Sequence, residues 1–276
     1  MKTFYSQNSE DEIIKDILDR LNINENQDES KWCVEFGAWD GIFGSNSNYF
    51  ITKKLYKAVL IEGDSNKYKD LISNMKNYDV KAFNKYISFS GENTLDNILS
   101  KTDIPKEFEF VSIDIDGNDY YIWESFNEYR PKLVIIEFNP SISNEIEFIQ
   151  PKDMSINQGC SPLSLVKLAK LKGYELVATN LNNCFFVDKK YYNQFNIQDN
   201  SLYQLRTDLS HVSYIFNGYD GHIFIRGYQK LDLYSLQYNE KRMQLIPNFL
   251  QEWSSRSKLK RFFQRIHRSL KKRNII

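Results

Sequence analysis

The chain has 276 residues, enough for one large domain or for one domain with an appendage. Hydrophobic residues make up 41% of it, so a sizeable core can form. Its three cysteines, Cys33, Cys160 and Cys184, have no paired spacing, which argues against a disulfide framework or a zinc knuckle and favours a reducing compartment. The N-terminus lacks the apolar core of a signal peptide, and no apolar run reaches the ~20 residues of a membrane span.

The formal net charge is zero, but the charges are unevenly distributed. Residues 256–276 hold nine of the 36 lysines and arginines and no acid. The other 255 residues therefore carry 27 basic and 36 acidic groups, a balance of −9. An acidic body is a poor match for nucleic acid, which needs a basic face, so we expect no nucleic-acid partner.

Apolar spacing over residues 10–21 predicts an amphipathic helix, and the polar segment 22–31 after it is typical of a loop. Strand-like and helix-like segments then alternate along the chain. The expected strands are 32–36, 57–64, 80–88, 108–117 and 131–139. The expected helices are 47–56, 65–78, 93–101, 120–126 and 161–174, the last with Pro162 in its first turn and Gly173 near its end. Two more strands, 174–180 and 182–190, form a hairpin-like ending, and the whole alternation predicts a mostly parallel α/β sheet.

Four of the expected strands end in acidic residues. In parallel α/β sheets, ligands bind outside the carboxyl ends of the strands, at the point where the strand order reverses. We therefore expect a site at this edge of the sheet, built from Glu35, Glu62, Asp114, Asp116 and Glu137.

The turn after the first strand, "EFGAWDGIFG", has the spacing of a nucleotide-binding loop. Gly37 allows a sharp turn, and Gly41 is expected to let the backbone approach a ligand. The two glycines are four residues apart, whereas the dinucleotide fingerprint places them two apart. With Glu35 two residues before Gly37, the pattern resembles the first motif of class I S-adenosylmethionine-dependent methyltransferases, and Glu62 is then placed to bind ribose hydroxyls. The alternative is that both glycines serve only a tight turn.

A larger set of motifs occurs in the order found in the FkbM family of methyltransferases, which the chain resembles over roughly residues 5–190. These motifs are "YSQNSEDEII", "VEFGAWDG", "VLIEGD", "VSIDIDGNDYYIW", "LVIIEFNPS", "GCSPLSLVKLAKLKGYELV" and "NNCFFV". The resemblance implies S-adenosylmethionine as cofactor and O-methylation, often of sugar or polyketide-type hydroxyls. The chain departs from the family at Ser112–Gly117, where members often have Lys-Ile-Asp-Val-Glu-Gly. We therefore expect it to resemble a subgroup with its own substrate.

The resemblance also implies a fold and a division of the chain. The expected fold is the Rossmann-like class I methyltransferase fold, with a mostly parallel seven-stranded sheet, one antiparallel edge strand and a C-terminal appendage. The expected regions are a methyltransferase domain at 1–190, a substrate-associated part of the same domain at 191–253, and a basic tail helix at 254–276. The candidate cofactor-binding residues are Gln7, Glu35, Gly37, Ala38, Gly41, Glu62, Gly63 and Asp114.

An alcohol that accepts a methyl group must lose its proton to a base, or a metal must lower its pKa. On an extended strand Asp114 and Asp116 share one face, so either is a candidate general base, with Glu137 and Asn139 orienting the acceptor. Asp114, Asp116 and Glu137 could instead hold a divalent cation such as Mg²⁺. In the simplest alternative, Asp114 and Glu137 only cap backbone amides.

For several other residues, the sequence is compatible with a functional role and with a structural role. Gln7, Glu10 and Asp11 are expected either to close over the pocket or, for the two acids, to stabilise a helix N-terminus by charge. Trp39 could stack on adenine or fill the core. His211 and His222 have no evident partner, so a packed or hydrogen-bonded role is favoured over catalysis.

In the tail, apolar residues recur at helical spacing from Leu259 to Leu270, with lysine and arginine on the other face. A basic amphipathic helix is typical of a peripheral anchor on anionic lipid through residues 256–273, and docking onto the acidic body is the alternative.

Taken together, the sequence and the resemblance predict a cytoplasmic O-methyltransferase that acts on a sugar or glycan-precursor hydroxyl. If its tail binds lipid, we expect it to be peripheral at the inner face of the membrane. The alternatives are a nicotinamide-dependent oxidoreductase and a degenerate methyltransferase-like binding module.

Overall fold

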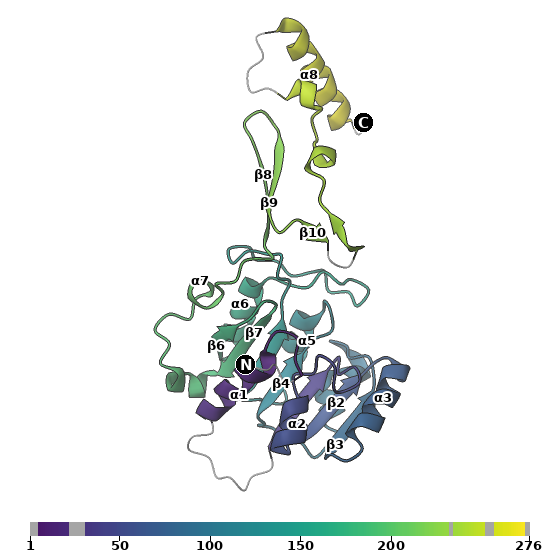
Figure 1. The fold of residues 1–276 in the computed structure, drawn as a ribbon, viewed down its shortest axis with the longest axis vertical. Coiled ribbons are helices and arrows are strands. Elements are labelled where there is room, and N and C mark those ends of the chain that lie inside the picture. Colours follow the sequence, from purple (N-terminus) through teal and green to yellow (C-terminus); the bar gives the residue numbers. More distant parts are fainter. Residues whose placement is uncertain (1–4, 22–30, 232–233, 252–256, 274–276) are drawn as a thin grey trace. The chain divides into compact units, whose positions relative to one another are not determined.

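The computed structural model describes residues 5–21, 31–231, 234–251 and 257–273 (Figure 1). The polar segment predicted to be a loop lies outside the described residues except for Lys31. The chain divides into two compact units, unit 1 (Met1–Leu209) and unit 2 (Ser210–Ile276). The finer division expected at residues 190 and 253 stays a prediction.

Unit 1 contains a seven-stranded sheet in the order β3-β2-β1-β4-β5-β7-β6, and the order reverses between β1 and β4. All neighbours from β3 to β5 pair in parallel, whereas β7 is antiparallel to both β5 and β6. The fold predicted from the sequence is confirmed, with the antiparallel strand next to the β6 edge. The strands are β1 (Trp32–Phe36), β2 (Lys57–Glu62), β3 (Val80–Asn84), β4 (Phe110–Ile113), β5 (Leu133–Glu137), β6 (Tyr174–Thr179) and β7 (Asn183–Asp188).

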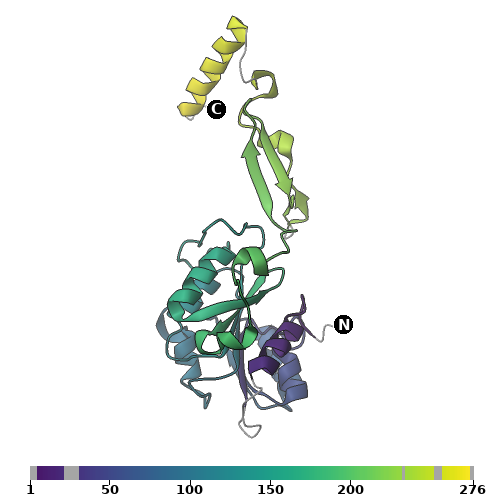
Figure 2. The same ribbon diagram turned by 90° about the vertical axis from the view of Figure 1, so that its left-hand side faces the viewer.

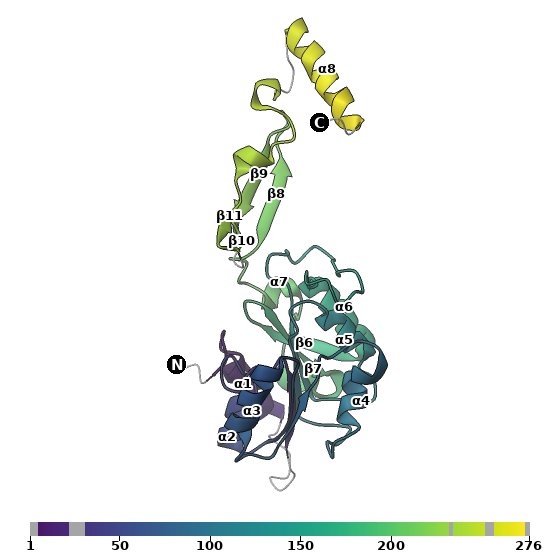
Figure 3. The same ribbon diagram turned by 90° about the vertical axis from the view of Figure 1, so that its right-hand side faces the viewer.

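Helices cover both faces of this sheet, so each face has its own core (Figure 3). One core lies under α1 (Glu10–Leu21), α2 (Asn48–Lys54) and α3 (Ser65–Met75). The other lies under α4 (Leu95–Leu99), α5 (Asp119–Ser125) and α6 (Pro162–Lys172), where Val34, Val59, Val111 and Val134 form one row across four strands. Burial on both faces explains why the central strands are continuous apolar runs.

Local signals fix where the elements begin and end. The Asp64 side chain accepts hydrogen bonds from Asn66 N and Lys67 N at the start of α3. In α6, Pro162 occupies the first turn and Gly173 closes the helix in the left-handed conformation, as predicted. The predicted strand 108–117 was too long, because β4 ends at Ile113 and the following acids lie in a loop.

Unit 2 is built from short elements (Figure 2). A hairpin of β8 (Ser213–Asn217) and β9 (Ile223–Gly227) and the pair β10 (Lys230–Leu231) and β11 (Leu236–Gln237) precede two 3-10 turns, η4 (Glu240–Met243) and η5 (Asn248–Leu250). Helix α8 (Lys258–Lys272) follows. In the part of the chain that the structure describes, no helix combines the length and the apolar character needed to cross a membrane.

Candidate active site

A cavity of about 560 Å³ opens at the carboxyl ends of β1, β2, β4 and β5. This is the edge at which the strand order reverses, so the cavity lies where ligands bind in open α/β sheets. Its walls include many of the residues predicted from the sequence, namely Gln7, Gly37, Glu62, Gly63, Asp114, Asp116 and Glu137.

Gly37 forms the sharp turn after β1. Its φ is +68°, and a Cβ at this position would lie 2.3 Å from the carbonyl oxygen of Asp114. The backbone of Gly37 therefore passes directly against the end of β4, which only glycine permits. The next residue, Ala38, is buried, and its N–H donates to the carbonyl of Ile61 (3.2 Å), so it ties the turn to β2 without lining the cavity.

Gly41 does not have the expected role. It is absent from the cavity wall, and a Cβ there would meet Leu71 Cδ1 at 2.6 Å and Met75 Cε at 2.8 Å on α3. The expectation that its backbone approaches a ligand is not supported by this position, because the second glycine allows the turn to pack against α3.

Glu35 is likewise buried away from the cavity, with 5% of its surface exposed. Its carboxylate accepts hydrogen bonds from Ser45 Oγ and Asn46 N, each at 2.7 Å, and from the hydroxyl of Ser47. Burial raises the pKa of Glu35, and these donors counteract that rise. The acid therefore organises the loop before α2 and does not contact a ligand in the cavity directly.

Glu62 stands at the end of β2, on the cavity wall. One carboxylate oxygen accepts from Trp39 N (2.8 Å) and the other from Asp64 N (2.7 Å). Each oxygen retains a second lone pair for a ligand hydroxyl. Gly63 follows, and a Cβ there would overlap the ring of Tyr86, which also lines the cavity.

Trp39 has 47% of its surface exposed and lines the cavity, so the interpretation as a core residue was wrong. The ammonium of Lys67 lies 4.0 Å from its ring centroid, a cation–π contact that holds the indole at the cavity mouth.

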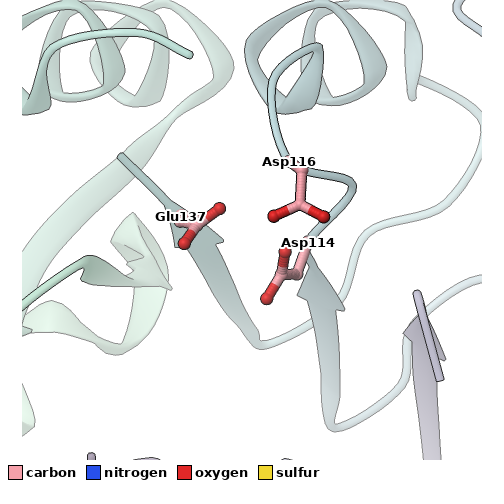
Figure 4. A group of neighbouring side chains, drawn as sticks. All are labelled: Asp114, Asp116 and Glu137. Carbon is pink, nitrogen blue, oxygen red and sulfur yellow. The ribbon is translucent and has the colours of Figure 1, made fainter. Parts of the chain in front are cut away.

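Asp114, Asp116 and Glu137 come together at the ends of β4 and β5, as Figure 4 shows. One carboxylate oxygen from each lies within 4.8 Å of the others. The prediction that Asp114 and Asp116 share one face of an extended strand was wrong, because the chain leaves β4 after Ile113. They meet instead because Asp116 adopts a φ of +56°, an unusual conformation for a residue other than glycine.

Charge repulsion is concentrated in this cluster. Burial, followed by the charges of Glu137 and Asp119, raises the pKa of Asp114 well above its usual range. Burial and the charge of Asp119 raise the pKa of Glu137 to about 7, opposed by a hydrogen bond from Asn182 Nδ2 (2.8 Å). Like charges a few ångströms apart cannot all ionise readily, so this arrangement opposes the full ionisation of the cluster.

Asp119 and Asn182 were not predicted from the sequence. The buried carboxylate of Asp119 accepts from Ile115 N (2.8 Å) and Gly117 N (2.9 Å), and so holds the loop that carries Asp116 in its left-handed conformation. Burial raises the pKa of Asp119 to about 6. In the sequence, Asp119 could have been found as an acid at the start of an expected helix, two residues after Gly117.

The N-terminal segment reaches the same cluster. Asn8 Nδ2 donates to Asn182 Oδ1 (3.1 Å), and Asn182 in turn donates to Glu137. The buried carboxylate of Glu10 anchors this segment, because it accepts from Asn180 Nδ2 and Asn8 N, both at 2.7 Å. Gln7 is thereby placed on the cavity wall.

Asn139 is the one predicted catalytic residue that the structure places off the cavity wall. Its side chain donates to the carbonyl of Gln158 (2.9 Å) and accepts from Ser141 N (3.0 Å). Both halves of the amide serve the loop after β5, so the expectation that Asn139 orients an acceptor is not supported by its position.

No family model matches the chain, and no curated protein matches it by sequence. Among solved structures, it is similar to the CurJ carbon methyltransferase (6% identity over 67% of this chain and 56% of that chain, TM-score 0.46). It is also similar to the citrinin polyketide synthase CMeT domain (13%, 64% and 52%, TM-score 0.43) and to M. capricolum TrmK in complex with S-adenosyl-homocysteine (11%, 62% and 67%, TM-score 0.38). The match covers about half of the citrinin domain's own chain. Likenesses this distant assign no activity, and the resemblance to the FkbM family stays a prediction.

Proposed function

We propose that unit 1 binds S-adenosylmethionine and transfers its methyl group to a hydroxyl of a sugar or glycan precursor. The observation that carries this proposal is one cavity, at the reversal of strand order, with the Gly37 turn and Glu62 on its walls and three carboxylates beside them.

The β1 and β2 side of the cavity suits the cofactor. Two backbone amides orient the carboxylate of Glu62, which leaves lone pairs for the two hydroxyls of a ribose. Gly37 places its backbone on the cavity wall, where it is available to the amino-acid part of the cofactor. The exposed indole of Trp39 offers an aromatic face for adenine.

The carboxylate cluster suits the acceptor. In the transfer, the bond from sulfur to the methyl carbon breaks as the bond from the acceptor oxygen forms, and the hydroxyl proton moves to a carboxylate. Asp116 is the exposed member of the cluster and Asp114 is its neighbour, so either can accept that proton, with Glu137 orienting the hydroxyl. Positioning of the oxygen in line with the sulfur provides much of the rate acceleration.

The same three residues also fit a hard divalent cation, because they offer oxygen ligands within 4.8 Å of one another and repel each other without one. Bound there, Mg²⁺ would lower the pKa of the acceptor hydroxyl.

The sugar or glycan class of acceptor, such as a precursor of a surface polysaccharide, rests on the resemblance to the FkbM family. It is compatible with a cavity whose acceptor side presents carboxylates and amides to hydroxyl donors. Cys33, Cys160 and Cys184 are all free and buried, which supports a reducing, cytoplasmic setting.

The first experiment is a calorimetric titration of the protein with S-adenosylmethionine, S-adenosylhomocysteine and NAD. We expect micromolar binding of both sulfur ligands, at least a hundredfold weaker binding by Glu62→Ala, and no change in Glu92→Ala, which removes an exposed acid outside the cavity. Binding of NAD alone would favour an oxidoreductase, and binding of none of the three by folded protein would favour a non-catalytic module.

If the cofactor binds, methyl transfer is measured over a panel of sugars and nucleotide sugars, with Mg²⁺ or with EDTA. Activity that survives EDTA supports a carboxylate base, and activity that requires Mg²⁺ assigns the cluster to the cation.

A further inference from the structure

Helix α8 is attached to the rest of unit 2 through polar side chains. Gln264 Nε2 donates to the carbonyl of Leu250 (2.7 Å), and His267 Nε2 lies 3.2 Å from the carbonyl of Leu245. These residues are three apart and lie on one side of a helix that is about 22 Å long. Leu245 precedes the turn η5 and Leu250 is its last residue, so this side of α8 faces the rest of unit 2.

The apolar residues of α8 lie on a different side and are exposed. The exposed fraction is 65% for Leu259, 56% for Phe262, 48% for Phe263 and 39% for Ile266. Their spacing places them in one stripe, which we call the apolar stripe. In most surface helices such a stripe packs inward, whereas here the polar side holds the helix and the apolar stripe is left outward. An apolar surface of this kind is typical of a binding site.

The charges around the apolar stripe have one sign. Helix α8 contains seven lysines and arginines and no acid. A turn of about 100° per residue places Lys258 and Arg265 along one border of the stripe, whereas Lys260 and Lys271 lie on the same side as Gln264 and His267. Long cationic side chains beside an apolar surface can lie along it and extend their charge to the level of lipid phosphates.

We propose that unit 2 docks on an anionic lipid bilayer through α8, with the apolar stripe in the acyl boundary and the flanking cations at the lipid headgroups. Charge complementarity selects this partner. Protein interfaces are depleted in lysine, and a nucleic-acid backbone has no use for an exposed leucine and phenylalanine stripe. An anionic bilayer uses both features of the same helix. The proposal does not depend on the reaction in unit 1.

The test is flotation of the full-length protein with vesicles of phosphatidylcholine alone and vesicles that contain 30% phosphatidylglycerol. We expect at least tenfold stronger partition onto the anionic vesicles at low salt, with the difference reduced at high salt. The double variant Phe262→Ser and Phe263→Ser should lose at least tenfold of this binding. Leu171→Ser, which removes a leucine that is 85% exposed in unit 1, should lose none.

A second variant reports on insertion directly. Phe262→Trp keeps the aromatic surface, so it should bind as the wild type does, and its fluorescence should shift to the blue and be quenched by lipids brominated in their acyl chains. The variant Lys258→Glu and Arg265→Glu should bind at least tenfold more weakly to anionic vesicles.

Several results would overturn the proposal. Equal binding to both vesicle types, binding that survives the serine variant, or no binding at all would each do so. A dimer in solution that disappears in the serine variant would assign the stripe to a second copy of the chain. Tight RNA binding that persists in the serine variant, without vesicle binding, would assign the cations to nucleic acid.

Discussion

The two units of this chain treat their polar and apolar groups in opposite ways. Unit 1 buries charged groups such as Glu10, Glu35 and Asp119 and satisfies each with several donors. Unit 2 buries few of its described apolar residues, among them Val212, Ile225 and Leu250, and exposes phenylalanine and leucine on α8. Burying an acid is costly unless hydrogen bonds compensate, and these hydrogen bonds hold the loops around the cavity in place, whereas an exposed apolar stripe is costly in water and indicates a surface partner.

The two units also differ in their titratable groups. All three histidines, His211, His222 and His267, belong to unit 2, so the titratable groups on the cavity wall of unit 1 are mainly carboxyl groups. A base for neutral pH must then come from the carboxylate cluster, in which burial raises the pKa of Asp114 and of Glu137.

The largest effect is expected for Asp116→Asn. The amide cannot accept the hydroxyl proton, so kcat should fall by about 10²–10⁴-fold, while the affinity for S-adenosylmethionine should change less than about threefold. Single-turnover methyl transfer and calorimetry measure the two quantities separately. Asp70→Asn, an exposed acid on α3, is the matched control. An active Asp116→Asn enzyme would remove Asp116 as the base and leave Asp114.

The second-largest effect is expected for Gly37→Ala, which should reduce both stability and cofactor binding. The new Cβ would lie 2.3 Å from the carbonyl oxygen of Asp114, at a φ that alanine disfavours, so we expect a loss of more than about 2 kcal/mol in unfolding free energy and of cofactor binding. Gly91→Ala is the control, because Gly91 has a similar φ of +77° but no atom within 4 Å of its Cβ position. It should cost about 1–2 kcal/mol and leave binding intact. Equal effects of the two variants would show that the close approach to Asp114 is unimportant.

Much of unit 1 could be predicted from the sequence, because its strands and helices are long enough to show a clear period. Element ends were less accurate, since an extended chain continues past the last paired residue, as it does after Ile113. The predicted roles of site residues were inaccurate or incomplete where a role depends on a neighbour that is distant in the sequence. Gly41 packs on Met75, and Glu137 binds Asn182, contacts that no local pattern contains. Arg206 was missed for the same reason. It is buried, and its guanidinium donates to the carbonyls of Ile142 (2.7 Å) and Pro140 (2.9 Å).

Unit 2 could be predicted only at α8, where a strong amphipathic period exists. Its other elements are strands of two to five residues and single 3-10 turns, and such short pieces show no period from which an arrangement follows.

The pH dependence of stability provides a smaller test of the acid cluster in unit 1. Burial, followed by the charges of Asp119 and Asp116, raises the pKa of Glu137 from its usual 4.5 to about 7. Its contribution is therefore complete below pH 4.5 and is lost as pH rises toward 7. Glu137→Gln removes this loss, so the free energy of unfolding of the variant should gain about 3 kcal/mol relative to the wild type as the pH rises from 4.5 to 7, and no more above pH 7. Urea unfolding without divalent cations measures the difference, and a gain that is constant with pH would contradict the raised pKa.

The smallest effect is expected in unit 2, at His222. Its Nδ1 lies 3.1 Å from Gln251 Oε1 and its Nε2 lies 3.2 Å from Glu240 Oε1, and since both partners accept, the ring is favoured in its doubly protonated form. These hydrogen bonds raise the pKa of His222 above 6.5, first through Gln251 and then through Glu240. The stability they provide is present below pH 6.5 and is lost as pH rises through the raised pKa of His222.

Nuclear magnetic resonance can follow this titration without interference from unit 1, which has no histidine. Glu240→Gln should move the His222 midpoint toward lower pH, whereas Glu92→Gln, in unit 1, should leave it in place. A His222 midpoint unaffected by Glu240→Gln would show that this contact does not hold the ring in solution.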